Sequence, residues 1–324
     1  MKEPKYIDAI KYSWSFIWHH KILWGLGILA MFIGQFGLGN FIGKIWVSGE
    51  KLVLTGEPMG QGVKLWFFGL APYQFNDLAI LWLLVLLLTM IVVITFVGVV
   101  SQGALVAAAA RGSKDKSIKN ISKFWDSGVK HFWKVLLANI IQKIVLAMLF
   151  VDLIFIWRFI MDSSCRFPSL AFILSMGVIL FLAILVSVLF IYTIGYIVVD
   201  DKKMLDAFKS AYKLFSRHIL VSIELSLVML LLGIALVVVI VLVLAILYFP
   251  SLLIGLVAGA LNSFALLLIG VSLSTVFVVG FIILASGVFN AFTISTWTYM
   301  FIRMHKEGLK SRIIHHLEKI LKRK

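Results

Sequence analysis

Four polar side chains lie within otherwise apolar stretches of this sequence. Lys143 lies about nine residues into the apolar segment 135–157, and Asn139 and Gln142 precede it by four and one residues, so all three share one helix face. A lysine near the middle of a bilayer costs roughly 2.5–3.5 kcal/mol on insertion scales. A contact with Glu224, near the start of a later apolar segment, would neutralise both charges. We therefore treat these four residues as a candidate intramembrane polar site.

Three roles are open for that site. The residues form structural pairs inside a helix bundle, they line a polar cavity for a lipid headgroup or a small solute, or their charges reach the membrane surface and have no role.

A second group of residues is basic and lies on amphipathic segments. In "KMLDAFKSAYKLFSRHI" (203–219) the apolar residues recur at helical spacing, and the basic residues fall mainly on the opposite side. Segments 5–22 and 117–134 have the same pattern. Such helices lie at a membrane surface, where their cations meet anionic lipid. The expected headgroup contacts are Lys11, His20, Lys130, Lys209, Lys213, Arg217 and His218.

Residues for catalysis or metal binding do not form a recognisable set. The chain has one cysteine, Cys165, and its adjacent histidine pairs have no carboxylate or cysteine at ligand spacing. No phosphate-binding glycine loop, G-x-S-x-G or H-E-x-x-H sequence is present. We therefore expect no enzymatic activity, no cofactor and no metal. An intramembrane enzyme is the least supported class.

The elements that carry these residues are expected to be transmembrane helices. Of the 324 residues, 62% are hydrophobic, and the segments 78–110 and 170–199 contain no Asp, Glu, Lys or Arg. About 20 apolar residues suffice to cross a bilayer. The sequence predicts an all-α integral membrane protein with six transmembrane helices, over residues 22–43, 77–110, 135–157, 169–199, 219–248 and 270–302. The apolar segment 251–264 is either re-entrant, interfacial or part of the last span.

The distribution of the 30 Lys and Arg residues predicts the orientation. The segments 1–21, 111–134, 200–217 and 303–324 carry four, seven, five and eight of them, whereas 44–77, 158–168 and 250–265 carry three, two and none. Because cytoplasmic loops are rich in Lys and Arg, both termini are expected in the cytoplasm. The net charge of +15 is divided by membrane side and not gathered in one domain, which argues against nucleic-acid binding.

The amphipathic segments also indicate an internal repeat. Shifting residues 5–20 by 198 positions superimposes Lys11 on Lys209 and His20 on His218. Each unit would be a cytoplasmic amphipathic helix followed by a transmembrane hairpin. The predicted units are 1–111, 112–200 and 201–305, followed by a basic amphipathic tail over 306–324. Three unrelated surface helices with similar physical requirements are the alternative.

The segments "SQGALVAAAARGSKDKSIKNISKFWDSGVKHFWKVLL" and "YIVVDDKKMLDAFKSAYKLFSRHILV" resemble a loose group of bacterial six-span membrane proteins. The group includes the membrane domain found beside some glycerophosphoryl diester phosphodiesterases. The resemblance covers most of the chain and implies a six-span fold in the bacterial inner membrane. It transfers no catalytic residue, because a soluble phosphodiesterase domain is absent from this sequence.

Two functions follow from these observations. The first is a non-enzymatic inner-membrane protein that organises or handles anionic lipids or an envelope partner, which includes the possibility of a membrane protein partner. The alternative is a small transporter or lipid translocator that uses the polar site near Lys143 and Glu224.

Overall fold

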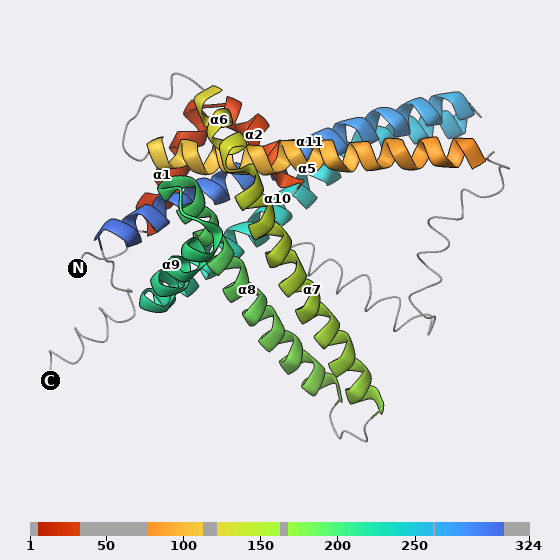
Figure 1. Ribbon diagram of the computed structural model, residues 1–324. Helices are drawn as coiled ribbons and strands as arrows, with labels where there is room; N and C mark the ends of the chain where they lie inside the picture. Colours follow the sequence, from red (N-terminus) through yellow and green to blue (C-terminus); the bar gives the residue numbers. More distant parts are fainter. Residues whose placement is uncertain (1–5, 33–76, 113–121, 163–167, 262, 308–324) are drawn as a thin grey trace, which may run out of the picture.

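The computed structural model describes residues 6–32, 77–112, 122–162, 168–261 and 263–307, and all regular elements in these ranges are α-helices. Figure 1 shows their arrangement. In chain order they are α1 (Tyr6–His19), α2 (Ile22–Met31), α5 (Asp77–Gly112), α6 (Ser122–Lys130), α7 (Phe132–Asp162), α8 (Pro168–Asp200), α9 (Met204–Arg217), α10 (Ile219–Ala260) and α11 (Phe264–Glu307). The helical class expected from the sequence is confirmed.

Five of these helices, α5, α7, α8, α10 and α11, are long and apolar enough to cross a membrane. They form because long runs of Leu, Ile, Val and Ala satisfy every backbone hydrogen bond internally, which an apolar surrounding demands. Helix α2 is a shorter apolar helix, and it coincides with the first part of the expected span 22–43. Residues 33–43 of that span lie outside the described part of the chain, as do residues 308–324 of the expected tail.

A short helix is followed closely by an apolar helix at three places. Helix α1 is separated from α2 only by His20 and Lys21, α6 is separated from α7 by His131, and α9 is separated from α10 by His218. The rings of His20 and His131 each place Nδ1 beside the carbonyl oxygen four residues earlier, at 2.9 and 2.7 Å. A donor at a helix C-terminus satisfies carbonyl groups that the ending helix leaves free.

Each short helix packs on one long helix. Helix α6 lies on α5 so closely that a Cβ atom on Gly128 would be 2.2 Å from the carbonyl oxygen of Val100. Helix α9 lies on α8, where the rings of Phe190 and Phe208 are 6.0 Å apart. Helix α1 lies on α11, where Tyr12 stacks on Tyr299 at 4.7 Å. The first helix of the chain therefore packs against the last long one.

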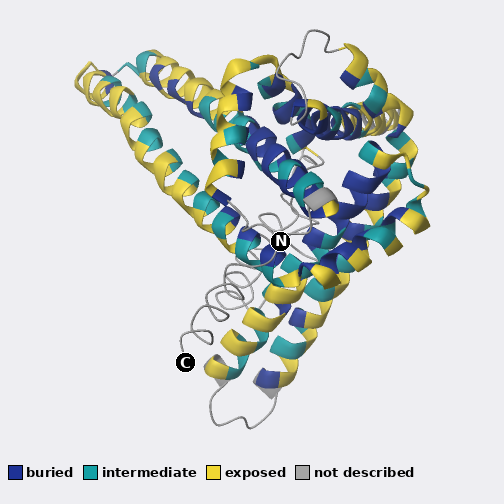
Figure 2. Ribbon diagram, turned by 90° about the vertical axis from the view of Figure 1, so that its left-hand side faces the viewer, coloured by how far each residue is buried: buried dark blue, intermediate teal, exposed yellow. Residues whose placement is uncertain are grey.

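The hydrophobic core lies where these short helices meet the C-terminal parts of α5, α8 and α11. Buried side chains are concentrated in residues 99–110, 187–198 and 290–304 of those helices (Figure 2). The opposite ends of the long helices are largely exposed, and α7 and α8 share a separate small cluster around Leu146 and Ala183. The α7–α8 and α10–α11 hairpins leave the core in different directions (Figure 1).

Two boundaries differ from those expected. Helix α10 continues through Pro250 to Ala260, and α11 already begins at Phe264, so residues 251–260 lengthen the fifth predicted span and not the last. A proline removes one hydrogen bond but does not end a helix whose flanks are apolar helix formers. Segment 117–134 is not one helix either, because the chain breaks at His131 and places Lys134 on α7.

Candidate functional site

Two members of the predicted intramembrane site, Asn139 and Gln142, are buried on α7. The amide of Asn139 donates to the side-chain oxygen of Gln102 on α5 at 2.8 Å and to the carbonyl oxygen of Val135 at 2.9 Å. Gln102 is fully buried, and its own amide nitrogen has no partner within the described residues. A polar pair of this kind joins two helices, because either amide alone would be unsatisfied in an apolar surrounding.

The two charged members of that site lie elsewhere. Glu224 is half-buried on α10, and it accepts a hydrogen bond from the hydroxyl of Tyr6, a buried residue at the start of α1. Lys143 lies on the exposed side of α7. The predicted contact between Lys143 and Glu224 stays a prediction. Tyr6 was missed by sequence reasoning, since nothing in the sequence relates two residues 218 positions apart.

The expected headgroup contacts fall into two groups. Lys11, Lys130, Lys209, Lys213 and Arg217 are exposed. On α9 they alternate with large apolar side chains that also face outward, since Leu205 and Tyr212 are 75% and 61% exposed. His20 is half-buried, and His218 is buried between α9 and α10, so His218 does not lie on the outward face expected for it.

A cluster of charges surrounds Asp201, in the connection between α8 and α9. Its carboxylate accepts from Lys130 at 2.6 Å, from Lys134 at 2.9 Å and from the Nε2 of His131 at 3.0 Å. These hydrogen bonds, that of Lys130 first, hold the pKa of Asp201 well below its usual range. Asp201 has a φ of 50°, a left-handed conformation that aspartate tolerates better than most residues. The cluster ties the α6–α7 break to the α8–α9 connection.

His131 is fixed at both ring nitrogens. Its Nδ1 lies 2.7 Å from the carbonyl oxygen of Ser127, and its Nε2 faces Asp201. Both partners are acceptors, so the ring makes both hydrogen bonds only when both nitrogens carry a proton. The side chains of Lys130, Lys134 and His131 therefore converge on one carboxylate, and the two lysines alone exceed its charge.

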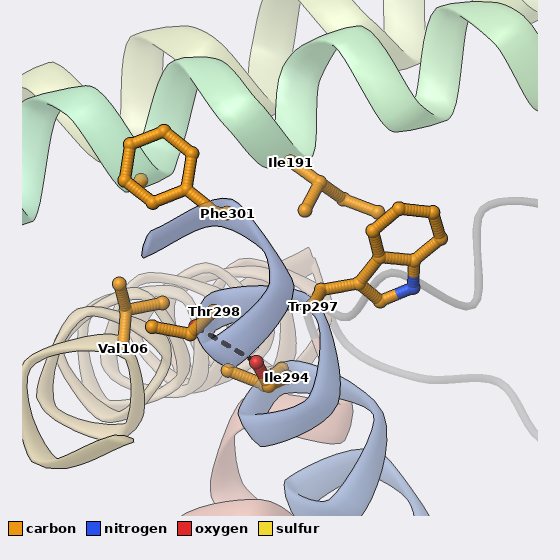
Figure 3. Close-up of a pocket in the computed structure, with 7 residues that line it drawn as sticks. Val106, Ile191, Ile294, Trp297, Thr298 and Phe301 are labelled. Atoms are coloured by element: carbon orange, nitrogen blue, oxygen red, sulfur yellow. Dashed lines mark hydrogen bonds between the residues drawn. The ribbon is translucent and has the colours of Figure 1, made fainter. Parts of the chain in front are cut away.

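A small cavity lies between α5, α8 and α11, lined by Val106, Ile191, Ile294, Trp297, Thr298 and Phe301 together with Gly195 (Figure 3). Its volume is about 10 Å³, and Thr298 directs its hydroxyl to the carbonyl oxygen of Ile294. About 10–15 Å³ is the minimum for one water molecule. The cavity is therefore too small for a lipid headgroup.

Within the described residues, no group of three or more His, Cys, Asp or Glu side chains is placed to hold a metal ion. The polar contacts that join different elements here include the Asn139–Gln102 and Tyr6–Glu224 hydrogen bonds and the cluster at Asp201. These are arrangements that hold helices together and present positive charge at one end of the fold.

The fold and these features define a helical protein with several helices suited to a membrane. Comparisons with models of protein families, with curated proteins and with solved structures find no match for this chain.

Proposed function

We propose that this chain is a non-enzymatic membrane protein of the bacterial inner membrane that binds anionic lipids with the end of the fold formed by α1, α6 and α9. The observation that carries the proposal is the outward face of α9. Lys209, Lys213 and Arg217 are exposed there beside Leu205 and Tyr212. A helix that exposes cations and large apolar side chains together fits the headgroup zone, where the apolar groups enter the lipid and the cations meet phosphate.

The outward face of α1 supports the same role. Trp14 and Trp18 are 51% and 43% exposed, and their rings contact each other edge to face at 5.5 Å. Tryptophan is enriched at membrane interfaces because its ring is apolar and its N–H is polar. Lys11 is exposed on the same helix. The surface at this end is therefore basic and aromatic on two separate helices.

The proposal includes six transmembrane helices in three repeats, with both termini in the cytoplasm. Three features support the repeats: the breaks at His20, His131 and His218, the short helix that precedes each break, and the agreement of the buried positions. Seven and three residues before each break, the residue is buried in all three short helices: Ser13 and Ile17, Phe124 and Gly128, and Ala211 and Phe215. The excess of Lys and Arg at this end supports the orientation.

The test is native mass spectrometry of the purified protein with identification of the lipid that remains bound. A variant with Lys209, Lys213 and Arg217 all changed to Gln is expected to lose a bound anionic lipid, since each cation near a charged surface contributes about 1 kcal/mol. A matched control changes the two lysines to Arg, which keeps the charge, and it should retain the lipid. Equal lipid binding by the Gln variant and the wild type would refute the proposal.

Lipid translocation is a second candidate, and one observation favours it. The buried amide nitrogen of Gln102 has no partner in the described part of the chain, although it lies beside Asn139 in the helix bundle. Such a donor could bind a polar group of a passing lipid. Translocation of a fluorescent lipid across vesicles containing the protein, compared with vesicles containing a Gln102→Leu variant, tests this role. Equal rates would refute it.

A further inference from the structure

The hairpin of α10 and α11 is about twice as long as the hydrocarbon core of a bilayer is thick. The two helices have 42 and 44 residues. At 1.5 Å per residue they are about 63 and 66 Å long, against a hydrocarbon thickness of about 30 Å. The sequence has no Asp, Glu, Lys or Arg between Glu224 and Arg303. No charged residue therefore marks the point at which this hairpin leaves the membrane.

The far end of the hairpin is apolar on its surface as well. Leu256, Leu261 and Phe264, beside the turn, are 73%, 67% and 73% exposed. The two helices remain in contact up to this end, where a Cβ atom on Gly270 would be 2.6 Å from the Cγ2 of Ile254. The outward side chains are therefore not needed to hold the hairpin together. In water, an exposed apolar surface of this size would be strongly unfavourable.

Two other connections between apolar helices differ in composition. The connection between α7 and α8 is flanked by Arg158, Asp162 and Arg166, and the segment 44–64 carries five charged residues, whereas the α10–α11 connection carries none. Charged residues fix a connection in water, because they are costly within hydrocarbon. If α7 and α8 cross the bilayer upright, the α10–α11 hairpin cannot also do so, since it leaves the core in a different direction (Figure 1).

We propose that the α10–α11 hairpin lies steeply inclined in the bilayer and that its turn at Leu261 stays in contact with lipid hydrocarbon. The uncharged parts of the two helices, residues 225–260 and 264–302, have an average length of about 56 Å. To place this length within about 30 Å of hydrocarbon, the hairpin axis must tilt by roughly 55–60° from the membrane normal. Transmembrane helices usually tilt by about 0–40°. The partner of this surface is therefore the lipid itself, along a much longer contact than an upright helix makes.

The depth of the turn can be measured with a spin label. The native Cys165 is changed to Ser, Leu261 is changed to Cys, and the labelled protein is placed in phospholipid vesicles. Oxygen dissolves in hydrocarbon and a nickel chelate stays in water, so the ratio of their collision rates with the label reports its surroundings. We expect oxygen to exceed the nickel chelate at position 261. We expect the reverse for wild-type protein labelled at Cys165, which is flanked by charged residues.

Two results would overturn the proposal. A nickel-chelate rate equal to or above the oxygen rate would place the turn in water. Low rates for both reagents would mean that protein covers the turn in place of lipid. Should the Leu261→Cys protein not fold, Leu256→Cys carries the same label about one helical turn earlier, and the same two results decide. Neither readout depends on the lipid-binding function proposed above.

Discussion

The crossing of α2 and α11 allows a sharp test of the packing. A Cβ atom added to Gly27 would lie 2.2 Å from the carbonyl oxygen of Gly287 and 2.9 Å from the Cβ of Ala291, and neither neighbour is a flexible side-chain end. The side-chain amide of Asn290 donates to the carbonyl oxygen of Gly27 at 3.1 Å. Gly25, two residues earlier on the same helix, is exposed, and a Cβ atom there would meet nothing within 4 Å.

These contacts predict stability changes of opposite sign for the same substitution, Gly to Ala, at the two positions. Gly25→Ala should raise the free energy of unfolding by up to about 1 kcal/mol, through helix propensity alone. Gly27→Ala has the same gain, but it forces the helices apart at a cost of about 1–3 kcal/mol. It also weakens the Asn290 hydrogen bond, which contributes about 0.5–1.5 kcal/mol. The two variants should therefore differ by about 2–4 kcal/mol, with Gly27→Ala the less stable.

The assay is unfolding in mixed micelles of dodecyl maltoside and increasing sodium dodecyl sulfate, followed by circular dichroism. Gly25→Ala serves as the control for the change in composition and in helix propensity. If Gly27→Ala unfolded at the same detergent fraction as Gly25→Ala, or at a higher one, the close crossing of α2 and α11 would be refuted.

Three further predictions test other parts of the structure. Asp201→Asn should lower the melting temperature at neutral pH. Because the pKa of Asp201 is lowered in the fold, the stabilisation by its carboxylate is present above about pH 4 and is lost as the pH falls further. The difference in melting temperature from wild type should therefore narrow below about pH 4, and a pH-independent difference would contradict this. Leu256→Lys should make the free energy of membrane insertion, measured by protease protection, less favourable by up to roughly 2.5–3.5 kcal/mol. Leu205→Lys, at an equally exposed position on α9, should change it by less than about 0.5 kcal/mol. Equal effects would refute the assignment of the two surfaces. Asn139→Leu should lower the free energy of unfolding in the mixed-micelle assay by about 1–2 kcal/mol. Adding Gln102→Leu should recover part of that loss, because neither amide of the pair is then left without its partner. Additive effects of the two substitutions would count against the pair.

The long helices could be predicted from the sequence because they depend on local composition. A run such as 170–199 has no alternative in an apolar surrounding but to satisfy its own backbone, and the structure has α8 there. The end of α10 could not be placed in the same way. Pro250 is a typical stop signal in water, but the residues after it are as apolar as those before it. The helix therefore ends at Ala260, where the chain turns.

Only those parts of the candidate site that lie on a single helix could be predicted from the sequence. The helical spacing of Asn139 and Gln142 correctly places both on one face of α7, and both are buried. Gln102, the partner of Asn139, lies 37 residues away, on a helix with no apolar or polar period to indicate the face it presents to α7. The contacts of the Asp201 carboxylate and the hydrogen bond from Tyr6 to Glu224 could not be predicted from the sequence for the same reason, since each depends on which helices become neighbours.

The packing of α1 also depends on which helices become its neighbours. The periodicity of residues 5–22 identifies an apolar face but not the surface that covers it. In the structure, α6 and α9 each pack on the long helix that precedes them in the chain. Helix α1 instead covers α11, the long helix at the other end of the chain, and Tyr6 adds a hydrogen bond to α10. Helix α2 packs against α11 as well, so both α1 and α2 contact the last long helix of the described chain. The stability of the end of the fold that contains the short helices therefore depends on contacts between the first and last parts of the described chain.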